Sequence, residues 1–228
     1  MKYHVEFDID FKRNTADGLY IAVEGIDGSG KTTQVDRLVA YFQKQGKEVI
    51  KTREPRKDEG LIGKLIQQIL LGKTKVPSVA FQYLFSADRE MHHKELILPA
   101  LEKGNVVISD RCFWSAIPYG ILDKNEEANQ QTVDRYMVAQ SILSMYHQFT
   151  IPNYTFYLDL PLDVAMERIE KSDSQEEIYE DEKKLEKVIY GYQWLLKEFP
   201  KELTVIDARK SVEEVTKEIL ARISSIKK

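Results

Sequence analysis

The sequence predicts an α/β fold in which a five-stranded parallel sheet is covered by helices on both faces. Short apolar runs alternate along the chain with segments that repeat apolar residues at helical spacing. The chain has 228 residues, which is most simply one domain. Strands that alternate with helices over the length of one domain are typical of a parallel sheet, because each crossover between parallel strands takes a helix.

Five apolar runs are predicted as strands, at residues 19–24, 48–52, 105–110, 154–159 and 203–207. The predicted helices follow residue 31, residue 61, residue 78 and residue 211, with a further helix around residues 131–147. The helix from Ser78 is expected to run towards Gly104 and to bend at Pro99, since proline removes a backbone donor.

The first residues carry a different pattern. Apolar and charged or polar residues alternate from Tyr3 to Phe11 with a period of two, which favours a β-strand. A turn near Asn14 to Gly18 would join it to the strand at 19–24. We therefore predict an N-terminal extension with an extra strand over residues 1–16, followed by the main domain over 17–228.

A glycine-rich stretch follows the first predicted strand. It reads IAVEGIDGSGKTTQ, residues 21–34, and fits the P-loop pattern G-x-x-x-x-G-K-[ST] with Gly25, Gly30, Lys31 and Thr32. In such a loop the backbone N–H groups surround a phosphate, the lysine neutralises phosphate charge and the threonine hydroxyl binds Mg²⁺. A chance glycine-rich turn is the alternative, but here a strand precedes the motif and an amphipathic helix follows it, as nucleotide binding requires. The fold is thus expected to be a three-layer fold of the P-loop NTPase type.

Composition narrows the possible functions. The net charge of −4 argues against a general nucleic-acid binder, which needs a basic face. Cys112 is the only cysteine, so an internal disulfide and zinc ligation by several cysteines are excluded. No apolar run reaches the length of a membrane span, and charges interrupt the N-terminus too often for a signal peptide. A cytoplasmic protein without a membrane or nucleic-acid partner is the expectation.

Polar residues stand at the ends of the predicted strands, where ligands bind in parallel sheets. Arg53 ends the second strand, and Asp110 with Arg111 ends the third. Asp110 can hold Mg²⁺ and the two arginines can hold phosphates. The adjacent His92 and His93 point about 100° apart on a helix and cannot share one metal ion, so they are predicted to lie on the helix surface.

Six segments in order resemble the thymidylate kinase family: VEGIDGSGKTTQ, KTREP, LFSADR, SDRCFWSAIPYG, PNYTFYLDLPLDVAMERI and TVIDARKSVEEV. The resemblance covers residues 19 to about 224. It implies the reaction ATP + dTMP → ADP + dTDP, with Mg²⁺ as cofactor, a mobile lid at about 169–184 and a homodimer. Phe85 would stack on the thymine, Arg89 would donate to a thymine carbonyl and Tyr119 would crowd a ribose 2′-hydroxyl.

The resemblance also implies a full set of site residues. The dTMP site would comprise Asp27, Arg53, Phe85, Arg89, Arg111, Ser115 and Tyr119. The ATP site would comprise Gly25, Gly28, Ser29, Gly30, Lys31, Thr32, Thr33, Arg168 and Arg209. The catalytic set would be Lys31, Arg53, Asp110, Arg111 and Arg168, with Thr32 and Asp110 at the metal.

One expected cation is missing. Kinases of this kind aim a cation at the transferring phosphoryl group from the P-loop or the lid, and those positions are Gly28 and Ile178 here. Arg168 is the first candidate to replace it, from the ATP side. Arg56 is the second, from the acceptor side.

Two other functions remain open from the sequence. The chain could phosphorylate another nucleotide or deoxynucleotide, or a nucleoside. It could also be a nucleotide switch or regulatory binding protein, although no Asn-Lys-x-Asp guanine motif is present and the substrate-pocket residues would then be unexplained.

Overall fold

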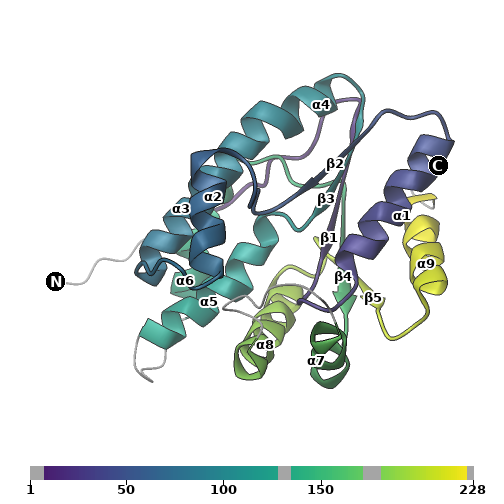
Figure 1. The fold of residues 1–228 in the computed structure, drawn as a ribbon. Coiled ribbons are helices and arrows are strands. Elements are labelled where there is room, and N and C mark those ends of the chain that lie inside the picture. The colour runs from purple at the N-terminus through teal and green to yellow at the C-terminus, as the bar shows by residue number, and fades with distance from the viewer. Residues whose placement is uncertain (1–7, 128–134, 172–180, 225–228) are drawn as a thin grey trace.

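The computed structural model of the chain describes residues 8–127, 135–171 and 181–224. Within these ranges five parallel strands form one sheet in the order β2-β3-β1-β4-β5 (Figure 1). The strands are β1 (Leu19–Glu24), β2 (Val49–Arg53), β3 (Val106–Asp110), β4 (Tyr154–Asp159) and β5 (Thr204–Asp207). The predicted five-stranded parallel sheet is confirmed. Each strand lies within one residue of its predicted bounds.

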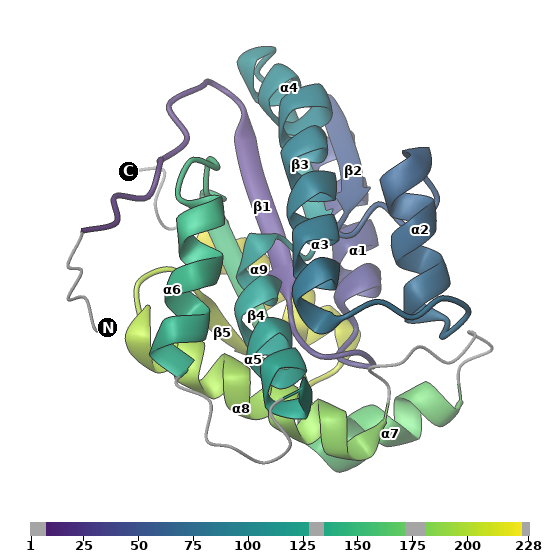
Figure 2. The same ribbon diagram turned by 90° about the vertical axis from the view of Figure 1, so that its left-hand side faces the viewer.

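Helices cover both faces of this sheet. The α-helices are α1 (Lys31–Lys44), α2 (Gly60–Leu70), α3 (Ser78–His92), α4 (Leu98–Glu102), α5 (Ala116–Glu127), α6 (Arg135–Tyr146), α7 (Leu162–Glu170), α8 (Glu182–Glu198) and α9 (Val212–Ser224). Helices α1 and α9 lie together on one face, while α3, α5, α6 and α8 lie on the other (Figures 1 and 2). Among the described helices, none combines the length and the apolar character needed to cross a membrane.

Helices α5 and α8 were not predicted from the sequence. The segment of α5 contains Pro118 and Gly120, which disguise its helical pattern, and α8 begins just after a strongly charged segment. The two helices pack closely against each other. Gly191 in α8 makes this possible, because a Cβ there would lie 2.7 Å from the Cα of Pro118.

The predicted helix from Ser78 towards Gly104 is interrupted before its proline. Between α3 and α4 the chain forms a π-helical turn, His93–Ile97, and Pro99 follows in the first turn of α4. Proline has no backbone N–H to donate, and the wider hydrogen-bonding pattern of a π-turn tolerates this missing donor.

His92 and His93 are buried, so the prediction that they lie on the helix surface is wrong. His93 Nε2 accepts a hydrogen bond from the Thr150 N–H at 3.0 Å, and its ring stacks on Phe149. His92 contacts Thr52 and Glu54 on the other side of the helix. The two rings therefore have separate partners, in agreement with the expectation that they do not share a metal ion.

The described part of the N-terminal extension, residues 8–16, leads into β1 (Figure 2) and contacts the domain through Phe11 and Lys12. Residues 1–7 lie outside the described part of the chain, and residues 8–11 form no strand. Lys12 makes an isolated parallel bridge with Thr150, and Phe11 packs edge-on against Trp114 with ring centroids 5.3 Å apart. The predicted extra strand is thus not seen where the structure describes the extension. The predicted turn is present, since Asn14 Nδ2 donates to the Gly18 carbonyl at 2.8 Å.

The contact at Gly191 gives a test of the fold. Replacing a helix glycine by alanine ordinarily stabilises the helix by about 1 kcal/mol. Here the new Cβ would meet Pro118 backbone at 2.7 Å, so we expect Gly191→Ala to lower the free energy of unfolding by about 1–3 kcal/mol. Urea denaturation measures this. Lys187→Ala on the exposed face of α8 is the control, and an equal or higher stability of Gly191→Ala would contradict the close packing.

The burial of His93 predicts a dependence of stability on pH. Burial lowers the pKa of His93 to about 4, below the value of about 6.5 in an unfolded chain. Between these values the unfolded state binds the proton and the folded state does not, so stability falls as the pH drops below 6.5. For this residue the loss at pH 5 is about 2 kcal/mol. His93→Gln keeps an acceptor for Thr150, and we expect its unfolding free energy to change less between pH 7 and pH 5 than that of the original chain.

Candidate active site

The P-loop connects β1 to α1 at the carboxyl edge of the sheet. Gly25, Gly28 and Gly30 all have positive φ, at 147°, 77° and 90°, which a residue with a side chain rarely adopts. At Gly28 a Cβ would also lie 2.6 Å from the Ala165 carbonyl oxygen. The loop therefore needs glycine at Gly28 both for its backbone conformation and for its close approach to α7.

The loop presents polar groups that suit a phosphate. The Lys31 ammonium is almost fully buried and donates to the Ile26 carbonyl at 2.8 Å. The buried Ser29 hydroxyl has no hydrogen-bond partner among the described residues. Buried polar groups are normally satisfied, so this hydroxyl together with the loop geometry fits a site for bound phosphate.

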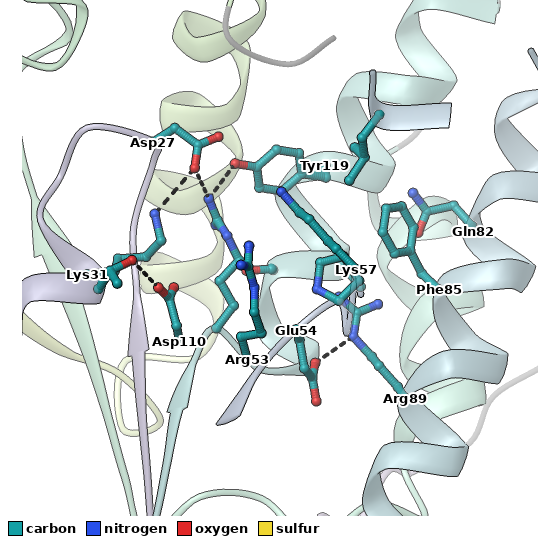
Figure 3. Close-up of a pocket in the computed structure, with 16 residues that line it drawn as sticks. Asp27, Lys31, Arg53, Glu54, Lys57, Gln82, Phe85, Arg89, Asp110 and Tyr119 are labelled. Atoms are coloured by element: carbon teal, nitrogen blue, oxygen red, sulfur yellow. Dashed lines mark hydrogen bonds and ion pairs between the residues drawn. The ribbon is translucent and has the colours of Figure 1, made fainter. Parts of the chain in front are cut away.

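A pocket opens beside this loop, and Figure 3 shows its lining residues. All seven residues predicted for dTMP line it: Asp27, Arg53, Phe85, Arg89, Arg111, Ser115 and Tyr119. They come from the P-loop, the ends of β2 and β3, the short helical turn Phe113–Ser115, and helices α3 and α5. Sequence reasoning missed six further lining residues: Glu54, Pro55, Lys57, Leu70, Gln82 and Ala116. Glu54 belongs to the KTREP motif and Lys57 follows that motif closely. The sequence therefore pointed to this segment, but not to these two side chains.

A second pocket lies on the other side of the P-loop. It is lined by residues 27–34, which span the P-loop and the start of α1. Arg168 and Ile169 of α7 and four residues between Ala208 and Val215 complete the lining. Seven of the nine residues predicted for ATP line it. Gly25 does not, because it lies at the base of the loop. Arg209 does not either, since its guanidinium pairs with Asp207 at 2.8 Å while Ala208 and Lys210 line the pocket.

The two pockets share one boundary, formed by Asp27, Lys31 and Thr32. Ligands bound in the two pockets would meet at these three side chains. For clarity we call the pocket with Phe85 the acceptor pocket and the pocket with Arg168 the donor pocket. Lys31 is thus the one lysine that lines both among the described residues.

Arg111 and Asp27 form an ion pair at this boundary. Arg111 Nη2 lies 2.7 Å from Asp27 Oδ1, and its Nη1 donates to the Gly25 carbonyl at 2.8 Å. Burial opposes ionisation of Asp27, but the charges of Arg111, Lys31 and Lys57 outweigh it and hold the pKa of Asp27 well below its usual range. Asp27 is therefore an anion held among three cations.

A buried carboxylate supports Arg111 from behind. Glu24 accepts hydrogen bonds from the Cys112 N–H at 2.8 Å, the Ser115 hydroxyl at 2.5 Å and the Tyr192 hydroxyl at 2.8 Å. Tyr192 in turn lies 3.3 Å from Arg111 Nη1. This role of Glu24 and Tyr192 was not predicted, because the two residues are far apart in the sequence and Tyr192 belongs to the unpredicted helix α8.

Phe85 and Arg89 share one face of α3, as their spacing predicts. The Arg89 guanidinium lies 5.5 Å from the Phe85 ring centre. Its Nε donates to Glu54 at 2.8 Å and its Nη1 donates to the Tyr146 hydroxyl at 3.0 Å. These contacts use two of the five N–H groups of the guanidinium, so Arg89 retains N–H groups that can donate to a ligand in the acceptor pocket, which it lines (Figure 3).

The predicted metal ligands lie together at the pocket boundary. Thr32 Oγ1 donates to Asp110 Oδ2 at 2.6 Å (Figure 3). Mg²⁺ takes oxygen ligands and is commonly bound through one or two carboxylates together with substrate phosphates. The described residues contain no cluster of three or more metal-ligating side chains. The hydroxyl and carboxylate present therefore fit a magnesium ion that arrives with a nucleotide.

The two candidates for the missing cation lie in different places. Arg168 lines the donor pocket, and its guanidinium donates to the Gly28 carbonyl at 3.4 Å and the Ala208 carbonyl at 3.2 Å. Arg56 lines neither pocket, because its guanidinium is buried against Asp88 at 3.2 Å. The prediction that Arg56 approaches from the acceptor side is therefore wrong. Besides Arg53, the cation that the REPRK segment places in the acceptor pocket is Lys57.

The parallel sheet, the P-loop and two pockets that meet at its lysine define a P-loop nucleotide-binding protein with a second ligand site. The sequence matches the family model described as thymidylate kinase over residues 23–219. The chain therefore belongs to the thymidylate kinase family.

Individual relatives agree with this assignment. The chain is 34% identical over 211 residues to a probable thymidylate kinase of Pyrococcus horikoshii, covering 90% of this chain and 96% of the relative. It is 35% identical over 217 residues to a thymidylate kinase of Bifidobacterium longum subsp. infantis, covering 92% and 87%. The solved structure of thymidylate kinase from Candida albicans superposes with a TM-score of 0.76 at 27% identity, over 92% of this chain and 93% of that one.

Proposed function

We propose that this chain transfers the terminal phosphoryl group of ATP to dTMP, with ADP and dTDP as products. Family membership supports this reaction. The observation that carries it is the boundary between the two pockets, where Asp27, Lys31 and Thr32 line both sites. Only an arrangement of this kind lets a phosphate bound on one side meet an acceptor bound on the other.

The acceptor needs no general base. A phosphate monoester has a second pKa near 6, so a nucleoside monophosphate is already a dianion at neutral pH. Arg53 and Arg111 line the acceptor pocket and would hold this dianion, while Lys31 would neutralise charge on the donor phosphates. Catalysis then consists of alignment and electrostatic stabilisation. When bound, Mg²⁺ would add further charge neutralisation at Thr32 and Asp110.

Recognition of the base is assigned to α3 and α5. In this proposal Phe85 stacks on the thymine, Arg89 donates to a thymine carbonyl and Tyr119 excludes a ribose 2′-hydroxyl. Asp27 would accept a hydrogen bond from the deoxyribose 3′-hydroxyl. These roles are supported by the pocket lining, because all four side chains line one pocket. Phe85 lies on α3 and Tyr119 on α5, two helices that pack against each other.

The remaining features are proposed on family grounds. Residues 17–228 would form the kinase domain, with 1–16 as an extension. The predicted lid at about 169–184 falls largely on residues 172–180, which lie outside the described part of the chain. We propose a homodimer in the cytoplasm. Exposed apolar side chains on α2 and α3, Leu61 at 86% and Tyr83 at 63%, are consistent with a surface that a second copy covers.

A coupled ADP-release assay tests the function. We expect the highest kcat/KM for dTMP when deoxynucleoside and ribonucleoside monophosphates are compared with thymidine and the other nucleosides. A preference for a nucleoside would move the acceptor assignment to a nucleoside kinase. ATP binding without turnover of any monophosphate would instead indicate a nucleotide switch.

Two variants test the base pocket. Phe85→Ala removes a stacking contact worth about 1–3 kcal/mol, and Arg89→Ala removes a donor to the base. We expect each to raise the KM for dTMP roughly tenfold or more and to leave the KM for ATP nearly unchanged. Steady-state kinetics at saturating cosubstrate measures both constants. A parallel rise in the two constants would show that this pocket does not bind the base.

Arg168 is proposed to supply the missing cation from the donor side. We expect Arg168→Ala to reduce kcat by roughly 10³-fold or more, the range of an arginine finger, and to weaken ATP binding far less. Lys171→Ala, which removes an exposed cation just after the same helix, serves as the control.

Lys57 is proposed as the additional cation on the acceptor side, because Figure 3 shows its side chain extending across the pocket towards Tyr119. The double variant Arg168→Ala with Lys57→Ala therefore belongs to the same experiment. Near-normal kcat in both single variants and in the double variant would leave Lys31, Arg53 and Arg111 as the whole cationic set.

A further inference from the structure

The buried His92 has no part in the function proposed above, yet it lies one contact away from the acceptor pocket. Its side chain is fully buried in α3. His92 Nδ1 lies 3.2 Å from Glu54 Oε1, and the other carboxylate oxygen of Glu54 accepts from Arg89 Nε at 2.8 Å. Glu54 therefore connects the histidine to the arginine that faces the base.

The other side of the ring is also fixed. His92 Nε2 lies 2.6 Å from Thr52 Oγ1 at the end of β2. Hydrogen bonding to His92 and the charge of Arg89 outweigh the cost of burial and lower the pKa of Glu54. An ionised Glu54 only accepts hydrogen bonds, so Nδ1 must be the donor. The opposite ring nitrogen, Nε2, shares a hydrogen bond with the Thr52 hydroxyl.

We propose that Thr52, His92 and Glu54 form a hydrogen-bonded chain that positions Arg89 for recognition of the acceptor base. His92 is a positioning residue in this chain, since it lines neither pocket. The inference rests on the proposed function, because it assigns a support to the same acceptor site. It adds two residues, Thr52 and His92, that neither family membership nor the motif pattern assigned.

The geometry explains why Arg89 needs such support. Glu54 lies in the loop after β2 and Arg89 lies on α3, so their ion pair joins two separate elements. A carboxylate held by one partner alone can rotate about its last side-chain bond, because that torsion is broad and weakly restrained. Hydrogen bonding at both oxygens removes this freedom. The direction of the Arg89 guanidinium is therefore fixed by Glu54 as well as by Tyr146.

Two substitutions at His92 test the roles of its two ring nitrogen atoms separately. In His92→Asn the side-chain amide can take the place of Nδ1 and continue to donate to Glu54. In His92→Gln the amide extends to the place of Nε2, near Thr52, and the bond to Glu54 is lost. We expect His92→Gln to raise the KM for dTMP about tenfold, the scale of a hydrogen bond to a charged group. The kcat at saturating dTMP and the KM for ATP should stay within about twofold of the original values. His92→Asn keeps the bond to Glu54 and loses only the contact with Thr52, so its KM for dTMP should rise only about threefold.

His93→Gln is the matched control. It makes the same change one residue away, at a ring that is also buried but contacts Phe149 and Thr150 rather than Glu54. We expect its KM for dTMP to match that of the original chain. Thr52→Val keeps the shape of the side chain and removes the hydroxyl that binds Nε2, so it tests the chain even where a change at His92 prevents folding. We expect it to raise the KM for dTMP about threefold, less than His92→Gln does.

The outcomes distinguish this inference from the proposed function. If the original chain does not phosphorylate dTMP, the proposed function fails. If the original chain is active and His92→Gln behaves like His93→Gln, the positioning role is overturned. An equal rise in His92→Asn and His92→Gln, or a rise in the KM for ATP as well, would indicate a packing role and would also overturn it. An unchanged KM for dTMP in Thr52→Val would show that Thr52 has no positioning role, and it would overturn the proposed hydrogen-bonded chain.

Discussion

The ion pair between Arg111 and Asp27 is the interaction on which the rest of the site depends. It joins the residue after β3 to the P-loop after β1, two segments that adjacent strands bring side by side. Arg111 adopts a left-handed backbone conformation with φ of 72°, which is uncommon for a residue with a long side chain and is found where surrounding contacts hold it. The Val23 carbonyl and the Ser109 hydroxyl bind its backbone on either side. This conformation turns the guanidinium towards the P-loop.

Buried carboxylates organise the arginines of this region in a common way. Glu24 supports Arg111 through Tyr192 and Ser115, and Glu54 pairs directly with Arg89. Such buried pairs contribute little net stability, because the cost of removing both charges from water offsets their attraction. Their value here is geometric. Each carboxylate gives a long and otherwise variable side chain a single direction, so the pocket is formed before a ligand arrives.

The sequence predicted the sheet and most of the site for identifiable reasons. Parallel strands buried on both faces read as unbroken apolar runs, so their bounds were visible. The P-loop has a fixed spacing, and the residues at the ends of β2 and β3 must lie at one edge of a parallel sheet. Helical spacing predicts that Phe85 and Arg89 share one face of a helix, and the resemblance to the family implied their place in the pocket. These features are local or follow directly from topology.

What could not be predicted depends on contacts between distant segments. Nothing local shows whether Arg56 or Lys57 turns inward, because the burial of Arg56 is decided by Asp88 on another helix. The histidines were misplaced for two reasons. His92 continues the buried face of α3 that carries Phe85 and Arg89, and His93 stands in the π-helical turn that follows, where it is buried against the distant Phe149 and Thr150. Helix α8 escaped notice because it begins just after a strongly charged segment, and α5 escaped notice because it contains Pro118 and Gly120, two residues that normally argue against a helix.

The packing of Phe11 has a consequence for where this domain begins. Phe11 packs against Trp114 and Phe199, whose rings also contact each other. Trp114 is part of the hydrophobic core and Phe199 packs against it. Trp114 stands three residues after Arg111, in the short helical turn that leads into α5. The extension thus covers the back of the segment whose front forms the acceptor pocket. A polypeptide that begins at β1 would contain the whole segment that resembles the family. It would lack Phe11, however, and would expose the aromatic surface of Trp114 and Phe199 that Phe11 contacts. The packed interior of this domain thus includes a residue that lies upstream of its recognisable motifs.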